Sequence, residues 1–119
     1  ITKEYAAPIT AASIVDTINE GKIHIVEPDL DAIVSKTVSN GFFKASTKAS
    51  SAEVYLIVVP TPFKGNHEPD ISFVEAATKG IIPLLKKGDL YIIESTSPIG
   101  TTDKMQKLIF ASRPELEGA

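Results

Sequence analysis

The sequence predicts an α/β fold in which a mostly parallel sheet lies between helices. Two short runs, Val54–Val59 and Leu90–Glu94, are rich in β-branched residues and are apolar on both faces. Such runs are typical of parallel strands whose two faces are both covered. A proline follows closely after each run and a helical pattern comes next. We therefore expect strand–helix–strand connections of the usual right-handed kind.

Four helices are predicted from apolar spacing and from residues that begin or end helices. They are expected at 11–20, at 29–40, from 72 to about 84, and from 100 to about 112. We expect Asp29 to cap the second helix, and Ser72 and Glu75 to form a capping box on the third. Pro83 lies inside this pattern, so we expect a kink or an early final turn of the third helix there.

The connecting segments are predicted from their composition. Residues 42–46 are a candidate strand, and residues 22–27 are a candidate for a brief extended piece. Residues 60–69 carry three prolines and one glycine and are expected to form a loop. With the two apolar runs, we expect a sheet of three or four mostly parallel strands.

Composition indicates one ordinary globular domain of 119 residues, with 43% hydrophobic and 23% charged residues. The net charge of −3, with scattered lysines and arginines, gives no footprint for nucleic acid or for an acidic membrane. The longest apolar runs are far too short to span a bilayer, and the first residues do not resemble a signal peptide. The absence of cysteine excludes disulfides and thiolate metal sites from this chain and is compatible with the cytoplasm.

Glycine spacing bears directly on nucleotide binding. A dinucleotide site normally holds the pyrophosphate on a glycine-rich turn at a helix N-terminus. No two of the seven glycines are two residues apart, so the sequence contains neither G-x-G-x-x-G nor a Walker loop. G-x-S-x-G is also absent, which argues against a serine nucleophile elbow. The chain therefore lacks the phosphate-binding half of a dinucleotide site.

Thr61 follows the first apolar run and lies between Pro60 and Pro62. The two prolines fix the backbone, so the hydroxyl projects from a rigid support. Ligands of parallel sheets bind outside the carboxyl ends of the strands, where Thr61 is expected. The alternative is a proline-stiffened strand exit whose threonine binds nothing.

A second group of polar side chains follows the second run, at Glu94–Pro98. Its three hydroxyls and one carboxylate can hold a water, a ribose or a developing oxyanion. Thr101 and Thr102 begin the next helix, where free amides attract anions or polar cofactor groups. The alternative is that one of these threonines is only an N-cap. No metal site is expected, because His24 and His67 are far apart. The run His67–Asp70 could bind a cation, but a solvated loop with an Asp or Ser helix cap is the favoured interpretation.

Three segments share their order and motifs with one enzyme family. They are Val54–Phe63, which ends in Val-Val-Pro-Thr-Pro-Phe, then Asp70–Ala77, and then Glu94–Thr102, which begins with Glu-Ser-Thr-Ser-Pro. Together they resemble the nucleotide-sugar 6-dehydrogenases, whose NAD-binding domain is Rossmann-like. Two further stretches, Asp16–Leu30 and Phe63–Asp70, are most similar to bacterial members that oxidise UDP-N-acetyl-D-mannosamine. The resemblance extends from about Ser13 to about Glu115.

The resemblance implies an oxidoreductase that uses NAD to convert the C6 alcohol of a UDP-sugar into a carboxylate by two hydride transfers. Thr61 matches a threonine that contacts NAD in the family. Thr96 matches a threonine that lies beside the nicotinamide in the active site and helps hold a water. Thr102 matches the second of two threonines, which also touches the cofactor. Thr96 is thus the catalytic candidate, and all three are candidates for cofactor binding.

The chain also departs from the family pattern. The family's first strand and glycine-rich turn are missing, Ile9 stands where a ribose-binding aspartate is expected, and residues 1–12 look unrelated to the family. The family's catalytic cysteine, with its lysine and glutamate partners, lies in parts beyond Ala119. We therefore expect residues 1–119 to be a single, incomplete, doubly wound domain, an interior piece of the NAD-binding domain that does not oxidise nucleotide sugars by itself.

Two consequences of the resemblance concern partners and alternatives. A sheet without its first strands exposes an unpaired edge, so we expect a homo-dimer or a higher homo-oligomer. The substrate of the parent enzyme is expected to be a UDP-sugar, in the bacterial cytoplasm, for surface-polysaccharide synthesis. The alternatives are a dehydrogenase acting on another UDP- or GDP-sugar, or a non-catalytic remnant that folds and self-associates.

Overall fold

A computed structural model of the chain describes residues 11–23 and 25–118. The expectations for residues 1–10, Ile9 among them, lie outside the described residues. The chain divides into two compact units, residues 1–48 and residues 49–119. Each unit is described by itself.

The first unit contains two helices, α1 (Ala11–Asn19) and α2 (Leu30–Ser39), which confirms both predicted helices. Asp29 occupies the N-cap position of α2, but its side chain makes no capping hydrogen bond. After α1 the chain turns through Gly21, whose φ is 78°. A side chain there would also be crowded, because a Cβ on Gly21 would lie 3.3 Å from the Cα of Ser35 on α2.

The predicted strand at 42–46 is wrong: this segment has no strand partner in the part of the chain that the structure describes. The amide side chain of Asn19 takes the place of a partner strand. It donates to the carbonyl oxygen of Ala45 at 2.9 Å and accepts the N–H of the same residue at 2.8 Å. Residues 22–23 and 25–27 are likewise not in a strand.

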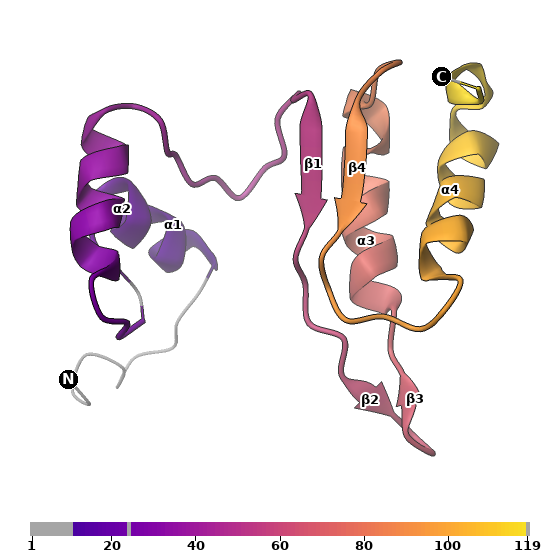
Figure 1. Ribbon diagram of the computed structural model, residues 1–119, viewed down its shortest axis with the longest axis horizontal. Coiled ribbons are helices and arrows are strands. Elements are labelled where there is room, and N and C mark those ends of the chain that lie inside the picture. The colour runs from indigo at the N-terminus through magenta and orange to yellow at the C-terminus, as the bar shows by residue number, and fades with distance from the viewer. Residues whose placement is uncertain (1–10, 24, 119) are drawn as a thin grey trace. The chain divides into compact units, whose positions relative to one another are not determined.

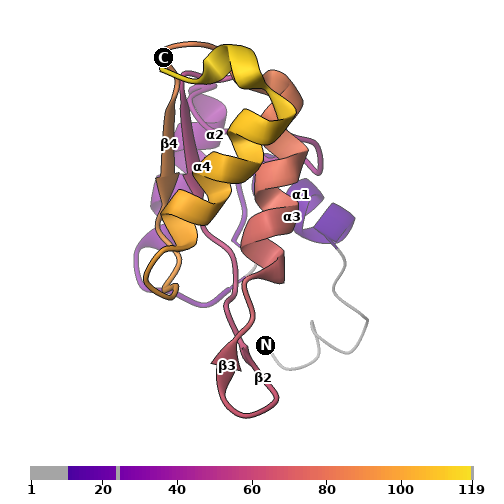
Figure 2. The same ribbon diagram turned by 90° about the vertical axis from the view of Figure 1, so that its right-hand side faces the viewer.

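The second unit contains a parallel two-stranded sheet covered by two helices (Figures 1 and 2). Strands β1 (Val54–Ile57) and β4 (Leu90–Ile93) pair in parallel, with Val54 opposite Leu90 and Ile57 opposite Ile93. Helices α3 (Ser72–Ile81) and α4 (Thr101–Ser112) both pack on one face of this sheet. The chain thus runs strand–helix–strand–helix, as predicted, but the parallel sheet of the described residues has two strands rather than three or four.

The hydrophobic core of the second unit lies between the sheet and its two helices. Its buried residues are Tyr55, Ile57, Val74, Ile81, Ile82, Leu85, Met105, Ile109 and Leu116. The opposite face of the sheet is exposed: alternate residues of β1 point away from the helices, and Val54, Leu56 and Leu90 are each more than half exposed. Within the second unit, helices therefore cover only one face of these strands. The apolar character of both faces remains a feature of the sequence.

Helix α3 ends as the proline predicts but begins differently. It stops at Ile81 and gives way to a 3-10 turn at Ile82–Leu84, which confirms the early final turn expected at Pro83. The predicted capping box is absent, since the N-cap residue of α3 is Ile71, whose side chain makes no capping hydrogen bond. Glu75 instead forms an ion pair with Lys104 of α4 at 3.1 Å. The carboxylate of Asp70 accepts the backbone N–H of Ser72 at 2.9 Å and so satisfies one free amide of the first turn.

The predicted loop at 60–69 contains a small antiparallel hairpin that projects beyond the carboxyl ends of β1 and β4 (Figure 1). Its strands are β2 (Phe63–Lys64) and β3 (Glu68–Pro69). Asn66 and His67 both have positive φ, and the N–H of Glu68 donates to the carbonyl of Gly65 at 3.1 Å. Two successive left-handed residues are the signature of a type I′ turn, whose twist matches that of a hairpin.

None of the helices that the structure describes has the length and apolar character needed to span a bilayer.

Candidate functional site

The register of the parallel sheet brings two of the predicted site residues to the same edge. Ile57 and Ile93 are the last paired residues, and both strands leave the sheet on the same side. Thr61 follows four residues after Ile57, and Thr96 follows three residues after Ile93. Thr61 is half-buried and Thr96 is exposed. Ligands of parallel sheets bind at this edge, outside the carboxyl ends of the strands.

Ser95, which precedes Thr96, uses its hydroxyl inside the protein. Its Oγ accepts the backbone N–H of Val59 at 2.7 Å and lies 3.4 Å from the carbonyl oxygen of Ile57, to which it donates. Of the three hydroxyls expected to face a ligand after β4, this one instead joins the two strand exits. The sequence alone does not show whether the hydroxyl of a serine at a strand end faces a ligand or bonds the neighbouring strand exit.

Thr102 is the second residue of α4 and is exposed. The residue before the helix, Gly100, is its N-cap and has a φ of 89°, which a side chain would strain. Neither Thr101 nor Thr102 caps the helix, since α4 has no side-chain capping hydrogen bond. Thr101 is buried, and its hydroxyl donates to the carbonyl oxygen of Pro98 at 2.8 Å. The N-cap alternative is thus wrong for both threonines.

The three predicted site residues have hydroxyls that the protein itself does not use. Within residues 11–23 and 25–118, no hydrogen bond engages the side chain of Thr61, Thr96 or Thr102. Their hydroxyls are therefore available to a ligand, in contrast to those of Ser95 and Thr101. Free hydroxyls suit the ribose and amide groups of a nucleotide, which both donate and accept hydrogen bonds.

A cavity of about 280 Å³ runs between β4 and α4. Thr102 contributes to its wall, together with Tyr91 and Phe110. Thr61 and Thr96 do not line it, so the structure joins Thr102 to this cavity rather than to the other two hydroxyls. The cavity therefore lies beside the strand-end site, not within it.

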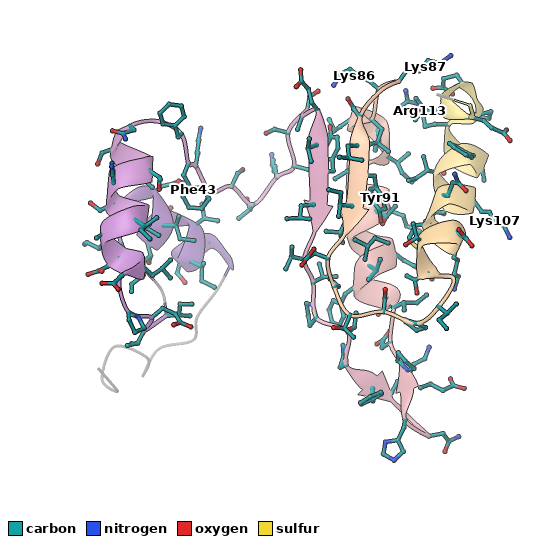
Figure 3. All side chains as sticks on the ribbon, in the orientation of Figure 1. Phe43, Lys86, Lys87, Tyr91, Lys107 and Arg113 are labelled. Atoms are coloured by element: carbon teal, nitrogen blue, oxygen red, sulfur yellow. The ribbon has the colours of Figure 1, made fainter. Side chains whose placement is uncertain are left out.

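Tyr91 of β4 lies on the wall of the cavity (Figure 3). Its hydroxyl lies 2.6 Å from that of Thr78 on α3, whose own hydroxyl donates to the carbonyl oxygen of Val74. Burial raises the pKa of Tyr91 above its ordinary value, and the hydrogen bond with Thr78 opposes part of that rise. This pair is a buried structural contact that the sequence did not single out.

The charged groups near the strand ends do not form an acid–base pair. The hydrogen bond from the backbone N–H of Ser72 lowers the pKa of Asp70, so this carboxyl is an anion at neutral pH. The described residues contain no group of three or more side chains able to hold a metal ion.

The residues present fit one part of a dinucleotide. The free hydroxyls at the sheet edge match the polar groups of a nucleoside. The 119 residues contain no pair of glycines spaced to cradle a pyrophosphate. The site therefore has the character of one wall of a dinucleotide pocket.

Comparison with known proteins decides the family. The model of the NAD-binding domain of the UDP-glucose/GDP-mannose dehydrogenase family matches residues 10–118. The chain belongs to this family. The Rossmann-like fold expected from the motifs is confirmed, because the structural relatives described next are dehydrogenases of the same family.

The relatives are enzymes of one type. The chain is 57% identical to the UDP-N-acetyl-D-mannosamine dehydrogenase of Yersinia pestis over 105 residues, which are 88% of this chain and 25% of that protein. It matches the structure of UDP-N-acetyl-mannosamine dehydrogenase from Staphylococcus aureus with a TM-score of 0.81 and 34% identity, over 87% of this chain and 25% of that one. The corresponding dehydrogenase of Pyrococcus horikoshii gives a TM-score of 0.81 and 35% identity, over 91% and 26%.

The chain spans about a quarter of the length of the proteins it matches. The matched quarter is the part that the family model describes as NAD-binding. The family membership therefore concerns the cofactor domain, and what the whole relatives do is a separate question.

Proposed function

We propose that this chain is part of an NAD-dependent dehydrogenase that oxidises the C6 alcohol of UDP-N-acetyl-D-mannosamine to the uronic acid. The observation that carries the proposal is 57% identity with enzymes of that name over 88% of the chain. Two free hydroxyls at one edge of a parallel sheet support it. We place the reaction in the bacterial cytoplasm, where it would serve surface-polysaccharide synthesis.

Three threonines are proposed to hold the cofactor. Thr61 and Thr102 would donate and accept hydrogen bonds with polar groups of NAD, and Thr96 would lie at the reacting end, where its hydroxyl can orient a water. NAD, when bound, supplies the hydride acceptor. The rigid exit between Pro60 and Pro62 supports the role of Thr61, because a fixed backbone leaves the hydroxyl little freedom to lose on binding.

The chain is proposed to be a single, incomplete NAD-binding domain that does not turn over sugar by itself. It contains no cysteine to act as a nucleophile and no glycine turn for the pyrophosphate. Of the segment 1–12, which we expected to be unrelated to the family, we propose that residues 1–9 lie outside the family pattern. The family match begins at residue 10 and so includes residues 10–12.

Isothermal titration calorimetry of the 119-residue protein with NAD tests the proposal. We expect weak, saturable binding that Thr61→Ala weakens several-fold, since about one hydrogen bond is lost. Thr47→Ala is the matched control, because Thr47 is likewise a loop threonine whose hydroxyl has no hydrogen-bond partner among the described residues. No saturable binding by the unmodified chain would favour the non-catalytic alternative.

A second candidate substrate is favoured by another relative. The chain is 53% identical to a protein named NDP-N-acetyl-D-galactosaminuronic acid dehydrogenase from Ralstonia nicotianae, over 86% of the chain. Because these two identities, 57% and 53%, are close, the sequence of the cofactor domain distinguishes the two substrates only weakly. A dehydrogenase acting on another UDP- or GDP-sugar is therefore the alternative within the same family.

We also propose that the chain self-associates. In the described residues each strand of the β1–β4 sheet has one unpaired edge, and the sheet face opposite the helices exposes Val54, Leu56 and Leu90. Unpaired edges and exposed apolar faces favour pairing with another chain. A second copy of this chain is the proposed partner, as a dimer or a higher homo-oligomer.

A further inference from the structure

The loops that carry Thr61 and Thr96 leave the sheet without a backbone ladder between them. The last backbone bond that joins the two strands is donated by the N–H of Glu94 to the carbonyl oxygen of Ile57, at 3.0 Å. Among the described residues, no backbone hydrogen bond links 58–62 to 95–99. A hydrogen bond that fixes these two loops relative to each other must therefore involve a side chain.

The first loop has few donors with which to make such a link. Pro60 and Pro62 carry no N–H, so between Ile57 and Phe63 only three backbone amides are available. One of them, the N–H of Val59, donates to Ser95 Oγ at 2.7 Å. Val59 lies two residues before Thr61, and Ser95 lies immediately before Thr96. The Ser95 hydroxyl thus links the first residues of both loops.

The Ser95 hydroxyl satisfies a backbone donor that the fold leaves without a backbone partner. Val59 and Ser95 are both half-buried, and Oγ also donates to the carbonyl oxygen of Ile57 at 3.4 Å. A partly buried donor that is left without a partner costs free energy, so this contact restrains the first loop. The side chain is short, and little rotamer freedom is lost in holding it.

We propose that Ser95 is a positioning residue for the cofactor: its hydroxyl sets the separation and orientation of the loops that present Thr61 and Thr96. It acts through these threonines and does not itself face the ligand. The inference rests on the proposed function in so far as NAD is the ligand that the two threonines bind.

The first test needs no ligand. In amide hydrogen exchange followed by NMR, we expect Ser95→Ala to speed exchange at Val59 by about tenfold or more, and the amide resonance of Thr61 to shift. Thr61 is the informative reporter, because it lies 34 positions before Ser95 in the chain, whereas Thr96 is its neighbour. Ser50→Ala is the matched control, since the Ser50 hydroxyl has no hydrogen bond within the described residues and lies in the segment before β1, away from both loops in the sequence. Unchanged exchange at Val59, or an unmoved Thr61 resonance, would overturn the proposal.

The second test uses NAD itself. We expect Ser95→Ala to raise the Kd for NAD about tenfold, Ser95→Thr to restore it because the hydroxyl returns, and Ser50→Ala to leave it unchanged. Urea unfolding of each variant gives the folded fraction under the assay conditions. A purely structural role would lower that fraction, whereas a positioning role raises the Kd of a protein that remains folded.

The two tests separate this inference from the function on which it rests. If the unmodified chain does not bind NAD, the proposed cofactor role fails, and the exchange experiment alone decides whether Ser95 fixes the loops. If the unmodified chain binds NAD and Ser95→Ala binds it equally well, Ser95 does not position the cofactor site, whatever happens to exchange at Val59.

Discussion

Among single residues, the hydroxyls of this domain divide into those that the fold uses and those that it leaves free. Ser95 and Thr101 are committed to backbone partners, whereas Thr61, Thr96 and Thr102 have none among the described residues. All five lie at strand ends or at a helix start, so position alone does not separate the two groups. The two groups differ in whether each hydroxyl has a hydrogen-bond partner among the described residues.

Thr78 and Tyr91 form the buried hydroxyl pair whose loss is most easily measured. Thr78 is fully buried, and Thr78→Val keeps its shape while removing the partner of the Tyr91 hydroxyl. We expect the free energy of unfolding to fall by about 1 to 3 kcal/mol, because a half-buried hydroxyl loses its partner. Tyr91→Phe should cost less, since the Thr78 hydroxyl keeps its bond to Val74. Urea unfolding of the two variants at neutral pH compares them, and a larger loss for Tyr91→Phe would contradict this account.

The same pair gives a pH dependence. Because the pKa of Tyr91 is raised in the folded state, the unfolded chain loses this proton first as the pH rises. The contribution is fully present below the ordinary tyrosine pKa of about 10 and is lost as the pH rises through the folded value. Tyr91→Phe should remove this part of the decline in stability above pH 10, and Thr78→Val should raise the Tyr91 pKa further. Ultraviolet titration of tyrosinate absorbance follows both.

At the level of elements, α3 and α4 are held to each other mainly by apolar burial. Met105 of α4 is 1% exposed and belongs to the core, whereas the neighbouring Lys104 makes an ion pair with Glu75 from a side chain that is 61% exposed. Burial of a large side chain contributes more than an exposed ion pair, because water and salt screen the charges.

Three substitutions in α4 test this ranking. Met105→Ala should lower the free energy of unfolding by about 2 to 5 kcal/mol, because it leaves a cavity in the core. Met105→Leu should cost less than about 1.5 kcal/mol, since the volume is nearly kept. Lys104→Ala should cost less than about 1 kcal/mol and should lose its effect in high salt. Equal losses for Met105→Ala and Lys104→Ala in urea unfolding would show that the ranking is wrong.

How well the elements could be predicted depended on where their stabilising contacts lie. The four helices and both parallel strands are local patterns of apolar spacing, and the structure confirms each of them. The hairpin after β1 was read as a loop, because its turn uses Asn66 and His67 rather than the usual Asn-Gly pair. The strand expected at 42–46 is wrong because a strand needs a partner that is distant in the sequence. In the structure the side chain of Asn19 instead bonds the backbone of Ala45 in this segment. At the site, the edge shared by Thr61 and Thr96 was predictable from the parallel sheet, whereas the bridge through Ser95 was not.

For the molecule as a whole, the incomplete sheet is the feature with the clearest consequence. The helices of the second unit cover one face of β1 and β4, and the other face keeps apolar residues exposed. We expect the 119-residue protein to form a dimer or a larger homo-oligomer whose mass rises with concentration. Light scattering after size-exclusion chromatography measures that mass. Leu56→Lys, on the exposed face, should shift it toward the monomer, while Lys107→Ala on α4 should not. A strictly monomeric mass at high concentration would contradict the expectation.

The central claim is that the sheet edge bearing Thr61 and Thr96 is one wall of an NAD site that continues to Thr102. The most direct measurement is a titration of the isotope-labelled protein with NAD, followed residue by residue in amide NMR spectra. The account predicts that the resonances of all three threonines shift along one saturable curve. Saturable shifts confined to other parts of the chain, or no saturable shift at any of the three, would contradict it.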